Sequence, residues 1–204
     1  IFMSEENYQS NMQWRVADIA VASVIGVVSA FIYWVVAIFS EVPWTALNSI
    51  LPGFAGLING LWLFAAPLAA VIVRKPGAAI YAEVVAGVLE ALMGNQWGGA
   101  ETFAIAVVQG LFAEIAFIIF AYKKWNLNTM ILSGALTGIG CWGYTFLGKL
   151  QAVSVFGKYG LPYFASTVVS GIVFAGVLMW FLYVGIAKTG ALDQFVSGRE
   201  IREK

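Results

Sequence analysis

Four glutamates lie in or beside two consecutive apolar stretches near the middle of the chain, at Glu83, Glu90, Glu101 and Glu114. A carboxylate in the hydrocarbon of a bilayer costs roughly 2.5–3.5 kcal/mol on insertion scales. Such residues face a cavity or a partner group instead of lipid, and they commonly serve ion, proton or ligand binding. The glutamates therefore predict a ligand-binding cavity between the two stretches.

The composition indicates an integral membrane protein. Of the 204 residues, 61% are hydrophobic and 11% are charged, whereas soluble domains carry about 25% charged residues. The chain has no histidine, which removes the commonest metal ligand and the usual general base. We therefore expect no catalytic residue, no metal site and no cofactor. The net charge of zero gives no indication of nucleic-acid binding.

Six apolar runs are long enough to cross a bilayer, since a spanning helix needs about 20 mostly apolar residues. They are Trp14–Phe39, Leu51–Val73, Pro76–Met93, Ala100–Tyr122, Met130–Leu150 and Tyr163–Ala187. The connections between them are short, so the sequence predicts one all-α integral membrane domain of six transmembrane helices over residues 1–204. Ile1 and Phe2 precede Met3, and we expect the native chain to begin at that methionine.

The basic residues orient the predicted bundle. If the spans alternate in direction, most Lys and Arg side chains fall on one side, and only Lys149 and Lys158 fall on the other. The positive-inside rule then places both termini in the cytoplasm, together with a tail over residues 188–204. The segment Ser40–Ile50 becomes a loop on the outside.

Polar and aromatic side chains gather in the outer half of this bundle. Glu83 and Glu90 lie seven residues apart, which puts both on nearly one helix face, about 10 Å apart along the axis. We expect Glu90, the outer of the two, to contact a ligand, Glu83 to bond to a neighbouring helix or to be protonated, and Glu114 to be structural or coupling. The other residues predicted to line an outward-facing binding cavity are Asn95, Trp97, Glu101, Gln109, Asn59, Trp62, Trp44, Trp142, Tyr144 and Tyr163. For Trp44, a place in the interfacial aromatic belt is the alternative.

Carboxylates beside aromatic rings suit a small, flat, cationic ligand. A carboxylate complements positive charge, and ring faces offer stacking and cation–π attraction. No G-x-x-x-x-G-K-[ST] motif occurs, so a transporter built on this chain would draw its energy from partner proteins. A stand-alone channel or facilitator for a small organic cation, an intramembrane enzyme and a purely structural membrane subunit are the alternatives.

A stripe of small residues runs along the first predicted span. Ala22, Gly26 and Ala30 recur every four residues, and such stripes let a second helix approach closely in lipid. Packing inside the bundle and docking of another membrane subunit both agree with the stripe.

Several motifs resemble the YkoE family, and together they cover nearly the whole chain. They are W-R-V-x-D-I at Trp14–Ile19, R-K-P-G-A-A at Arg74–Ala79, E-x-L-x-G-N at Glu90–Asn95, V-Q-G-x-x-A-E at Val108–Glu114 and T-G-A-L at Thr189–Leu192. The resemblance implies a six-helix substrate-capture (S) component of an energy-coupling-factor (ECF) vitamin transporter in a prokaryotic plasma membrane. Thiamin or its hydroxymethylpyrimidine precursor is the implied substrate, with riboflavin as an alternative vitamin.

The resemblance also assigns partners and roles to particular residues. It implies a transmembrane coupling subunit and two cytoplasmic ATPases, and it makes Ala22, Gly26 and Ala30 the expected docking face for the coupling subunit. Glu90 and Asn95 lie in one matching motif and Gln109 in another. The permanent positive charge of thiamin agrees with the acid-rich cavity expected from the residues alone.

Overall fold

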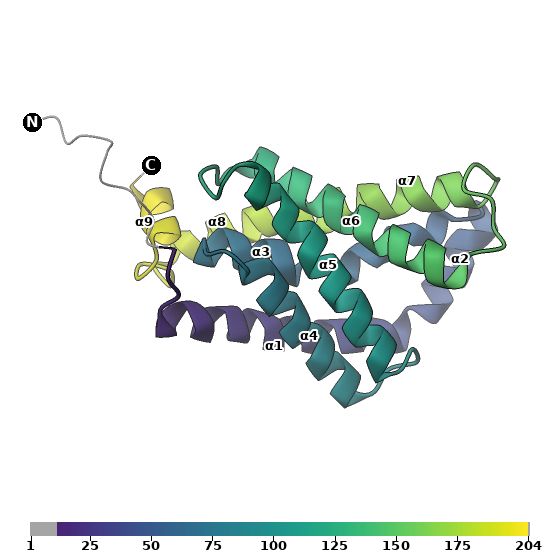
Figure 1. Ribbon diagram of the computed structural model, residues 1–204, viewed down its shortest axis with the longest axis horizontal. Coiled ribbons are helices and arrows are strands. Elements are labelled where there is room, and N and C mark those ends of the chain that lie inside the picture. The colour runs from purple at the N-terminus through teal and green to yellow at the C-terminus, as the bar shows by residue number, and fades with distance from the viewer. Residues whose placement is uncertain (1–11, 204) are drawn as a thin grey trace, which may run out of the picture.

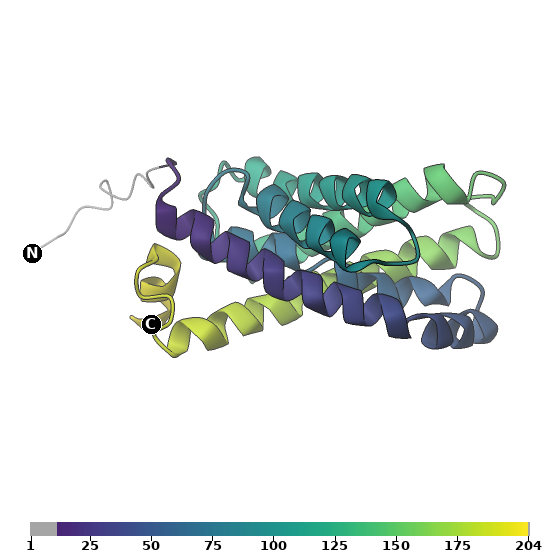
Figure 2. The same ribbon diagram turned by 90° about the horizontal axis from the view of Figure 1, so that it is seen from below.

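The structure, a computed structural model, describes residues 12–203, so the expectation about Ile1, Phe2 and the native start lies outside the described residues. The regular elements of residues 12–203 are all helical, and most helices run roughly along one long axis (Figure 1). The start of the first helix and the last helix, α9 (Val196–Arg202), lie at the same end of the molecule (Figures 1 and 2). We call this the terminal end and the opposite one the far end.

Among the described residues, four helical segments are long and apolar enough to cross a membrane. They are α1 (Val16–Phe39), α5 (Gly99–Ile119), α6 (Leu127–Lys149) and a continuous stretch made of α7 (Gly160–Ser170), the π-helix η3 (Gly171–Leu178) and α8 (Met179–Lys188). The bent pair η2 (Phe54–Trp62) and α3 (Ala65–Val73) makes a fifth span if it crosses as one unit. The protein is therefore an all-α, multi-pass membrane protein.

Helix α4 (Ala78–Met93) is shorter than a full span. It has 16 residues, which at 1.5 Å per residue gives about 24 Å, against roughly 30 Å of hydrocarbon in a typical bilayer. The predicted count of six spans consequently stays a prediction.

Two segments of the far half differ from their predictions. Ser40–Ile50, expected as an outer loop, contains the helix α2 (Glu41–Ile50), which has no buried residue. Leu51–Val73, expected as one continuous run, is broken into the 3-10 helix η2 and the α-helix α3, which meet at a bend of 41°. Gly53 permits the entry into η2 because its φ of 88° is readily adopted only by glycine.

Hydroxyl side chains of α7 hold η2 in its tight conformation. Ser170 Oγ donates to Leu57 O at 2.7 Å and accepts from Gly60 N at 2.6 Å. These bonds occupy backbone groups that would pair differently in a regular α-helix. A Cβ on Gly60 would lie 2.7 Å from Ser170 O, so the two segments touch backbone to backbone. We call the α7 side chains that bond to η2 or to Gly53 just before it the hydroxyl ladder: Tyr163, Ser166, Thr167 and Ser170.

The small-residue stripe of α1 faces the interior of the molecule. Ala22 and Ala30 are 0% and 1% exposed, and Gly26 is buried against α4. A Cβ on Gly26 would lie only 2.7 Å from Val85 Cγ1 and 2.9 Å from Ala82 O. The expectation that this stripe is a docking face for another subunit is therefore wrong, because α4 already covers it.

Two of the motifs meet in a turn at the terminal end. Arg74, with φ of 56°, ends α3, and Gly77, with φ of 83°, begins α4. Glu114 of α5 accepts the backbone N–H groups of Gly77 at 2.8 Å and Ala79 at 3.0 Å. The first N–H groups of a helix have no partner within it, so Glu114 caps α4 from a neighbouring helix. This geometry agrees with the structural role expected for that glutamate.

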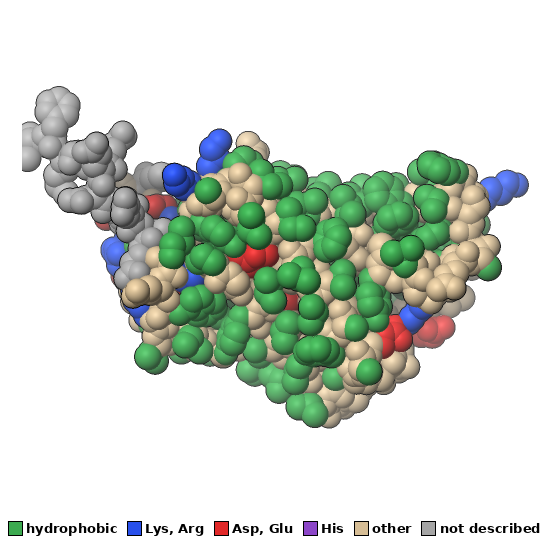
Figure 3. Space-filling model, viewed as in Figure 1, with side chains coloured by type: hydrophobic (Ala, Val, Ile, Leu, Met, Phe, Trp, Pro, Cys, Tyr) green, Lys and Arg blue, Asp and Glu red, His purple; other side chains and the backbone are tan. Residues whose placement is uncertain are grey.

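The surface is arranged as a membrane requires. Hydrophobic side chains cover most of the middle of the face seen in Figure 3, while Lys and Arg side chains gather toward its two ends. Large apolar side chains of α1 that point away from the bundle are among the exposed residues: Val24, Val27, Val28 and Phe31. Apolar exposure of this kind is favourable in lipid and costly in water.

Candidate functional site

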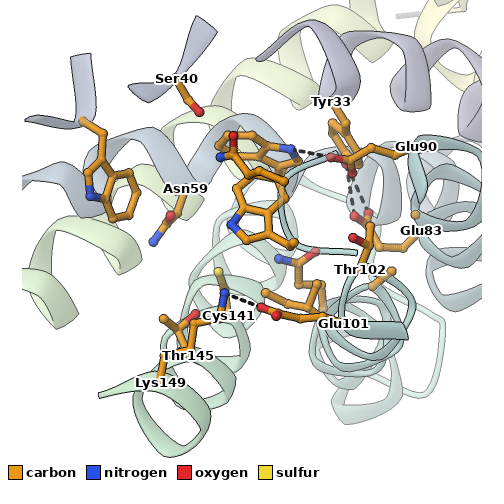
Figure 4. A pocket seen from close by; sticks show the side chains of 18 of the residues that line it. Tyr33, Ser40, Asn59, Glu83, Glu90, Glu101, Thr102, Cys141, Thr145 and Lys149 are labelled. Carbon is orange, nitrogen blue, oxygen red and sulfur yellow. Dashed lines mark hydrogen bonds and ion pairs between the residues drawn. The ribbon is translucent and has the colours of Figure 1, made fainter. Parts of the chain in front are cut away.

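A cavity of about 420 Å³ lies in the half of the molecule that carries α2. Pockets for small organic ligands usually enclose roughly 300–1,000 Å³. Its walls come from α1, α2, η2, α4, α5, α6 and α7, so segments from most of the chain converge on it. Figure 4 shows side chains from these elements pointing toward a common space.

Most of the residues predicted for the binding site line this cavity. Their side chains are carboxylates, amides and aromatic rings, as a flat polar ligand would require. They are Glu90, Trp97, Glu101, Gln109, Asn59, Trp62, Trp44 and Tyr163. Trp44 is therefore placed at the cavity, although its contacts with a ligand stay a prediction.

Three predicted residues lie outside the lining. The ring of Trp142 packs against Phe146 and Phe164, with centroids 5.3 and 4.9 Å apart, between α6 and α7. Tyr144 does not line the cavity either. Both corrections have one cause: the side of α6 that faces the cavity carries Cys141, Thr145 and Lys149, and residues one position away point about 100° elsewhere.

Asn95, the third such residue, lies behind the cavity wall and bonds to residues that line it. Its Nδ2 donates to Glu90 Oε1 at 3.3 Å and to Thr102 Oγ1 at 2.8 Å. Its Oδ1 accepts the backbone N–H groups of Trp97 and Gly98 at 3.2 and 3.1 Å. Asn95 thus holds the turn between α4 and α5 against the carboxylate of Glu90.

Glu90 is the centre of the polar wall of the cavity. It is 3% exposed, and Trp62 Nε1 donates to its Oε1 at 3.3 Å from the opposite segment η2. The Trp62 ring meets Trp97 edge to face, with centroids 5.4 Å apart. A carboxylate beside a pair of packed indoles can bind a cation whose ring lies against the aromatic faces.

Glu83, expected to bond to a neighbouring helix, does so and also lines the floor of the same cavity. It is 1% exposed and accepts from Tyr33 Oη at 3.1 Å and from Ala66 N at 2.9 Å. The seven-residue spacing from Glu90 was the sequence signal, because residues two turns apart share a helix face. Figure 4 shows both carboxylates on the same side of α4.

Several lining residues have no signal in the sequence. Tyr33 reaches the cavity from α1, and Tyr159 comes from the segment before α7. The remaining polar members missed by the sequence are Ser40, Glu41, Gln96, Thr102, Thr145 and Lys149. Their places depend on how distant segments pack, which no local pattern records.

The mouth of the cavity carries an ion pair and stacked rings. Lys149 pairs with Glu101 across α6 and α5 (Figure 4). Tyr159 stacks on Tyr163 with centroids 5.6 Å apart. Burial raises the pKa of the Tyr159 hydroxyl above its ordinary value.

The charge of the lining is strongly unbalanced. Among the described residues, the lining carboxylates are Glu41, Glu83, Glu90 and Glu101, and the one basic side chain is Lys149. Carboxylates enclosed by apolar walls raise the local concentration of cations more than the same charges in water would. The site is therefore suited to a positively charged or donor-rich organic molecule.

Comparison with known proteins agrees with this architecture. A family profile described as "ABC-type cobalt transport system, permease component" matches residues 17–140. YkoE of Bacillus subtilis strain 168, named as an HMP/thiamine permease protein, is 31% identical over 197 residues that cover 94% of each chain. The crystal structure of an S component of an ECF transporter superposes with a TM-score of 0.84 at 30% identity, again over 94% of each chain. The chain therefore belongs to the YkoE family of ECF transporter S components.

Proposed function

We propose that this S component captures thiamin or a hydroxymethylpyrimidine-type precursor in the cavity of the far half. The observation that carries the proposal is the position of Glu90, a buried carboxylate in the cavity wall that accepts from Trp62, whose ring packs edge to face against Trp97. A thiazolium or an aminopyrimidine offers the positive charge, hydrogen-bond donors and flat ring that this arrangement complements. The name of the Bacillus subtilis relative, an HMP/thiamine permease protein, supports the same class of substrate.

As a member of a family of transporter subunits, the chain is not an enzyme. We infer that it works with a transmembrane coupling subunit and two cytoplasmic ATPases, as an S component of an ECF transporter would. Capture needs only the preformed cavity, so the isolated chain should bind its vitamin without ATP.

The proposed topology is a single domain of six spans in a prokaryotic plasma membrane, with both termini in the cytoplasm. The shared location of α9 and the start of α1 supports it, because an even number of crossings returns the chain to the side on which it began (Figures 1 and 2). The basic residues Arg15, Arg74, Arg199 and Arg202 belong to that end as well, as the positive-inside rule requires of a cytoplasmic side.

Calorimetry on the detergent-solubilised chain tests the proposal, with thiamin, hydroxymethylpyrimidine and riboflavin as probes. We expect saturable binding of thiamin or the pyrimidine and weaker or no binding of riboflavin. Tight binding of riboflavin, with no binding of the other two probes, would show that this chain captures a different vitamin. Ligand flux into liposomes that contain only this chain would favour a stand-alone facilitator over a subunit that captures substrate for partner proteins.

A further inference from the structure

Glu83 contacts both the ligand cavity and the first turn of α3. What we infer from these two contacts rests on the proposed function. On one side it lines the floor of the ligand cavity. On the other it accepts the N–H of Ala66 at 2.9 Å, in the first turn of α3. The preceding N–H, that of Ala65, donates to Tyr33 Oη at 3.0 Å, and Tyr33 Oη donates to Glu83 Oε1 at 3.1 Å.

These contacts hold the break in the second span. Helix α3 begins where η2 ends, at a bend of 41°, and its first N–H groups have no partner within the helix. Glu83 and Tyr33 supply two of those partners from α4 and α1. The positive end of the α3 dipole also favours a negative charge at this position.

The carboxyl group of Glu83 has no cationic side chain beside it in the described part of the chain. Four basic side chains pair with other carboxylates: Arg15 with Asp18, Arg74 with Glu200, Lys149 with Glu101 and Arg202 with Asp193. A carboxylate has about four lone-pair sites, and backbone and tyrosine donors occupy only part of them. A donor or cation that enters the cavity can therefore bind the same two oxygens that hold the N-terminus of α3.

Helix α3 is built to transmit such a change to the terminal end. All nine of its residues, Ala65–Val73, are buried, so it is packed on every side, and such a packed segment transmits strain to its neighbours. Directly after it, Arg74 pairs with Glu200 of α9 at 2.7 Å and lies 5.5 Å from the ring of Trp125. One end of α3 thus touches the cavity floor, and the other touches the segment that folds against the terminal end.

We propose that Glu83 is a positioning residue that couples occupancy of the cavity to the packing of α3 and, through Arg74, to α9. When a ligand group engages Glu83, the contacts of Ala66 and Tyr33 with its oxygens rearrange, and the exchange protection of α3 and α9 changes with them. The surface that α9 forms at the terminal end then differs between the ligand-bound and the ligand-free protein.

Hydrogen exchange followed by mass spectrometry, with calorimetry on the same samples, tests this proposal. Thiamin is added at a concentration that saturates each variant, and exchange is measured over residues 63–74 and 192–203. Coupling between two sites typically amounts to about 5–150-fold in an equilibrium constant. In the unsubstituted chain we therefore expect ligand to alter the exchange rates of both segments by about fivefold or more.

Two isosteric variants separate the coupling of the cavity to α3 and α9 from the binding of the ligand. In Glu83→Gln the ligand-dependent change in α3 and α9 should be lost at saturation, whereas in Glu90→Gln, two turns away on the same helix, it should persist once the cavity is filled. A response retained in Glu83→Gln, or absent from the unsubstituted chain although heat of binding is measured, overturns the proposal. No heat of binding for any probe instead counts against the proposed function.

A third variant covers the case in which Glu83→Gln does not fold. Tyr33→Phe keeps the carboxylate and removes the hydroxyl that joins Ala65 to it. We expect Tyr33→Phe to reduce the exchange response of both segments while thiamin still binds. An unchanged response in Tyr33→Phe contradicts the proposed link just as directly.

Discussion

Trp62 Nε1 donates to Glu90 Oε1 at 3.3 Å and so joins η2 to α4 across the candidate cavity. Asn95 Nδ2 donates to the same oxygen, also at 3.3 Å, from the turn that follows α4. The carboxylate is thus oriented by two donors on one oxygen, which leaves Oε2 free of side-chain donors in the described structure. Oε2 is the atom that we expect a ligand to meet.

Replacing Glu90 by Gln keeps the shape of this group and removes its charge. Losing a hydrogen bond to a charged group costs about 1.5–3 kcal/mol, and breaking a buried ion pair costs about 3–5 kcal/mol. The affinity for thiamin should therefore fall by about ten- to several-thousand-fold. Calorimetry with thiamin measures it, and Glu203→Gln at the terminal end serves as the control with unchanged affinity. Wild-type affinity in Glu90→Gln would show that the ligand does not use this carboxylate.

Trp62→Phe separates the contribution of the indole N–H to ligand binding from that of the aromatic ring. Phenylalanine still offers an apolar face, but it cannot donate to Glu90 and is a weaker cation–π partner than tryptophan. We expect thiamin affinity to drop by about three- to tenfold, which corresponds to roughly 0.6–1.4 kcal/mol. A neutral pyrimidine analogue should lose less affinity than thiamin. Equal losses for both ligands would argue against a cationic group beside this ring.

Gly26→Leu should destabilise the protein, because the new side chain would push directly into Val85 and the backbone of Ala82. Overpacking a filled interior typically costs about 1–3 kcal/mol, and a contact with backbone leaves little room for relief. We expect a lower melting temperature and loss of thiamin binding together. Val27→Leu is the matched control, since Val27 is 51% exposed on the outer face of α1. If Gly26→Leu melts like the parent, the packing of α1 on α4 is not as tight as described.

The turn after α5 gives the protein a pH dependence on the alkaline side. Burial and the hydrogen bond to Glu114, at 2.7 Å, raise the pKa of Tyr122 above its ordinary value of 10.0. Because an unfolded tyrosine ionises near that value while the folded one does not, its contribution to stability is constant below pH 10.0 and is lost as the pH rises further. Thermal melts between neutral and alkaline pH measure this loss.

Glu114→Gln tests the cause of that shift. Removing the charge should lower the pKa of Tyr122 toward 10.0 without abolishing the effect of burial. Ultraviolet titration, read as the difference between each protein and its Tyr122→Phe counterpart, isolates this tyrosine from the others. An unchanged titration in Glu114→Gln would mean that burial alone sets the pKa.

Lys149→Met should speed capture of a cationic ligand. It releases Glu101 from the ion pair at the mouth and makes the cavity more negative. Charges at a binding site act mainly on the association rate and are screened by salt. We expect stopped-flow association of thiamin to accelerate a few-fold at low ionic strength and the gain to vanish at high salt. A similar acceleration for neutral hydroxymethylpyrimidine would point to a steric gate instead.

Local patterns in the sequence predicted much of the architecture. Every long apolar run except Leu51–Val73 became one continuous helical stretch within a few residues, and α1 ends at Phe39 as expected. The shared face of Glu83 and Glu90 follows from helical periodicity alone. Depth along the predicted spans likewise brought Asn59, Trp62 and Gln109 to the cavity.

The errors arose where position depends on rotation or on distant segments. Position along the predicted span placed Trp142 and Tyr144 in the outer half of the bundle. Which side chains face the cavity is decided by their angle around the α6 axis. The stripe at Gly26 agrees equally with internal packing and with a partner helix, since both need a close approach. The 3-10 form of η2 has no local signal in the sequence, because side chains of α7 stabilise it.

The hydroxyl ladder has a consequence for how the protein is made. The Gly60 to Ser170 bond spans 110 residues of sequence, and Ser166 reaches Gly53 over 113. In the bilayer core, backbone groups must be satisfied within protein, yet these partners are synthesised long after η2. Residues 54–62 should therefore enter the membrane as a regular α-helix and convert to the 3-10 form only when α7 docks. The cavity, whose wall includes Asn59 and Trp62, would then be completed by the last span to arrive.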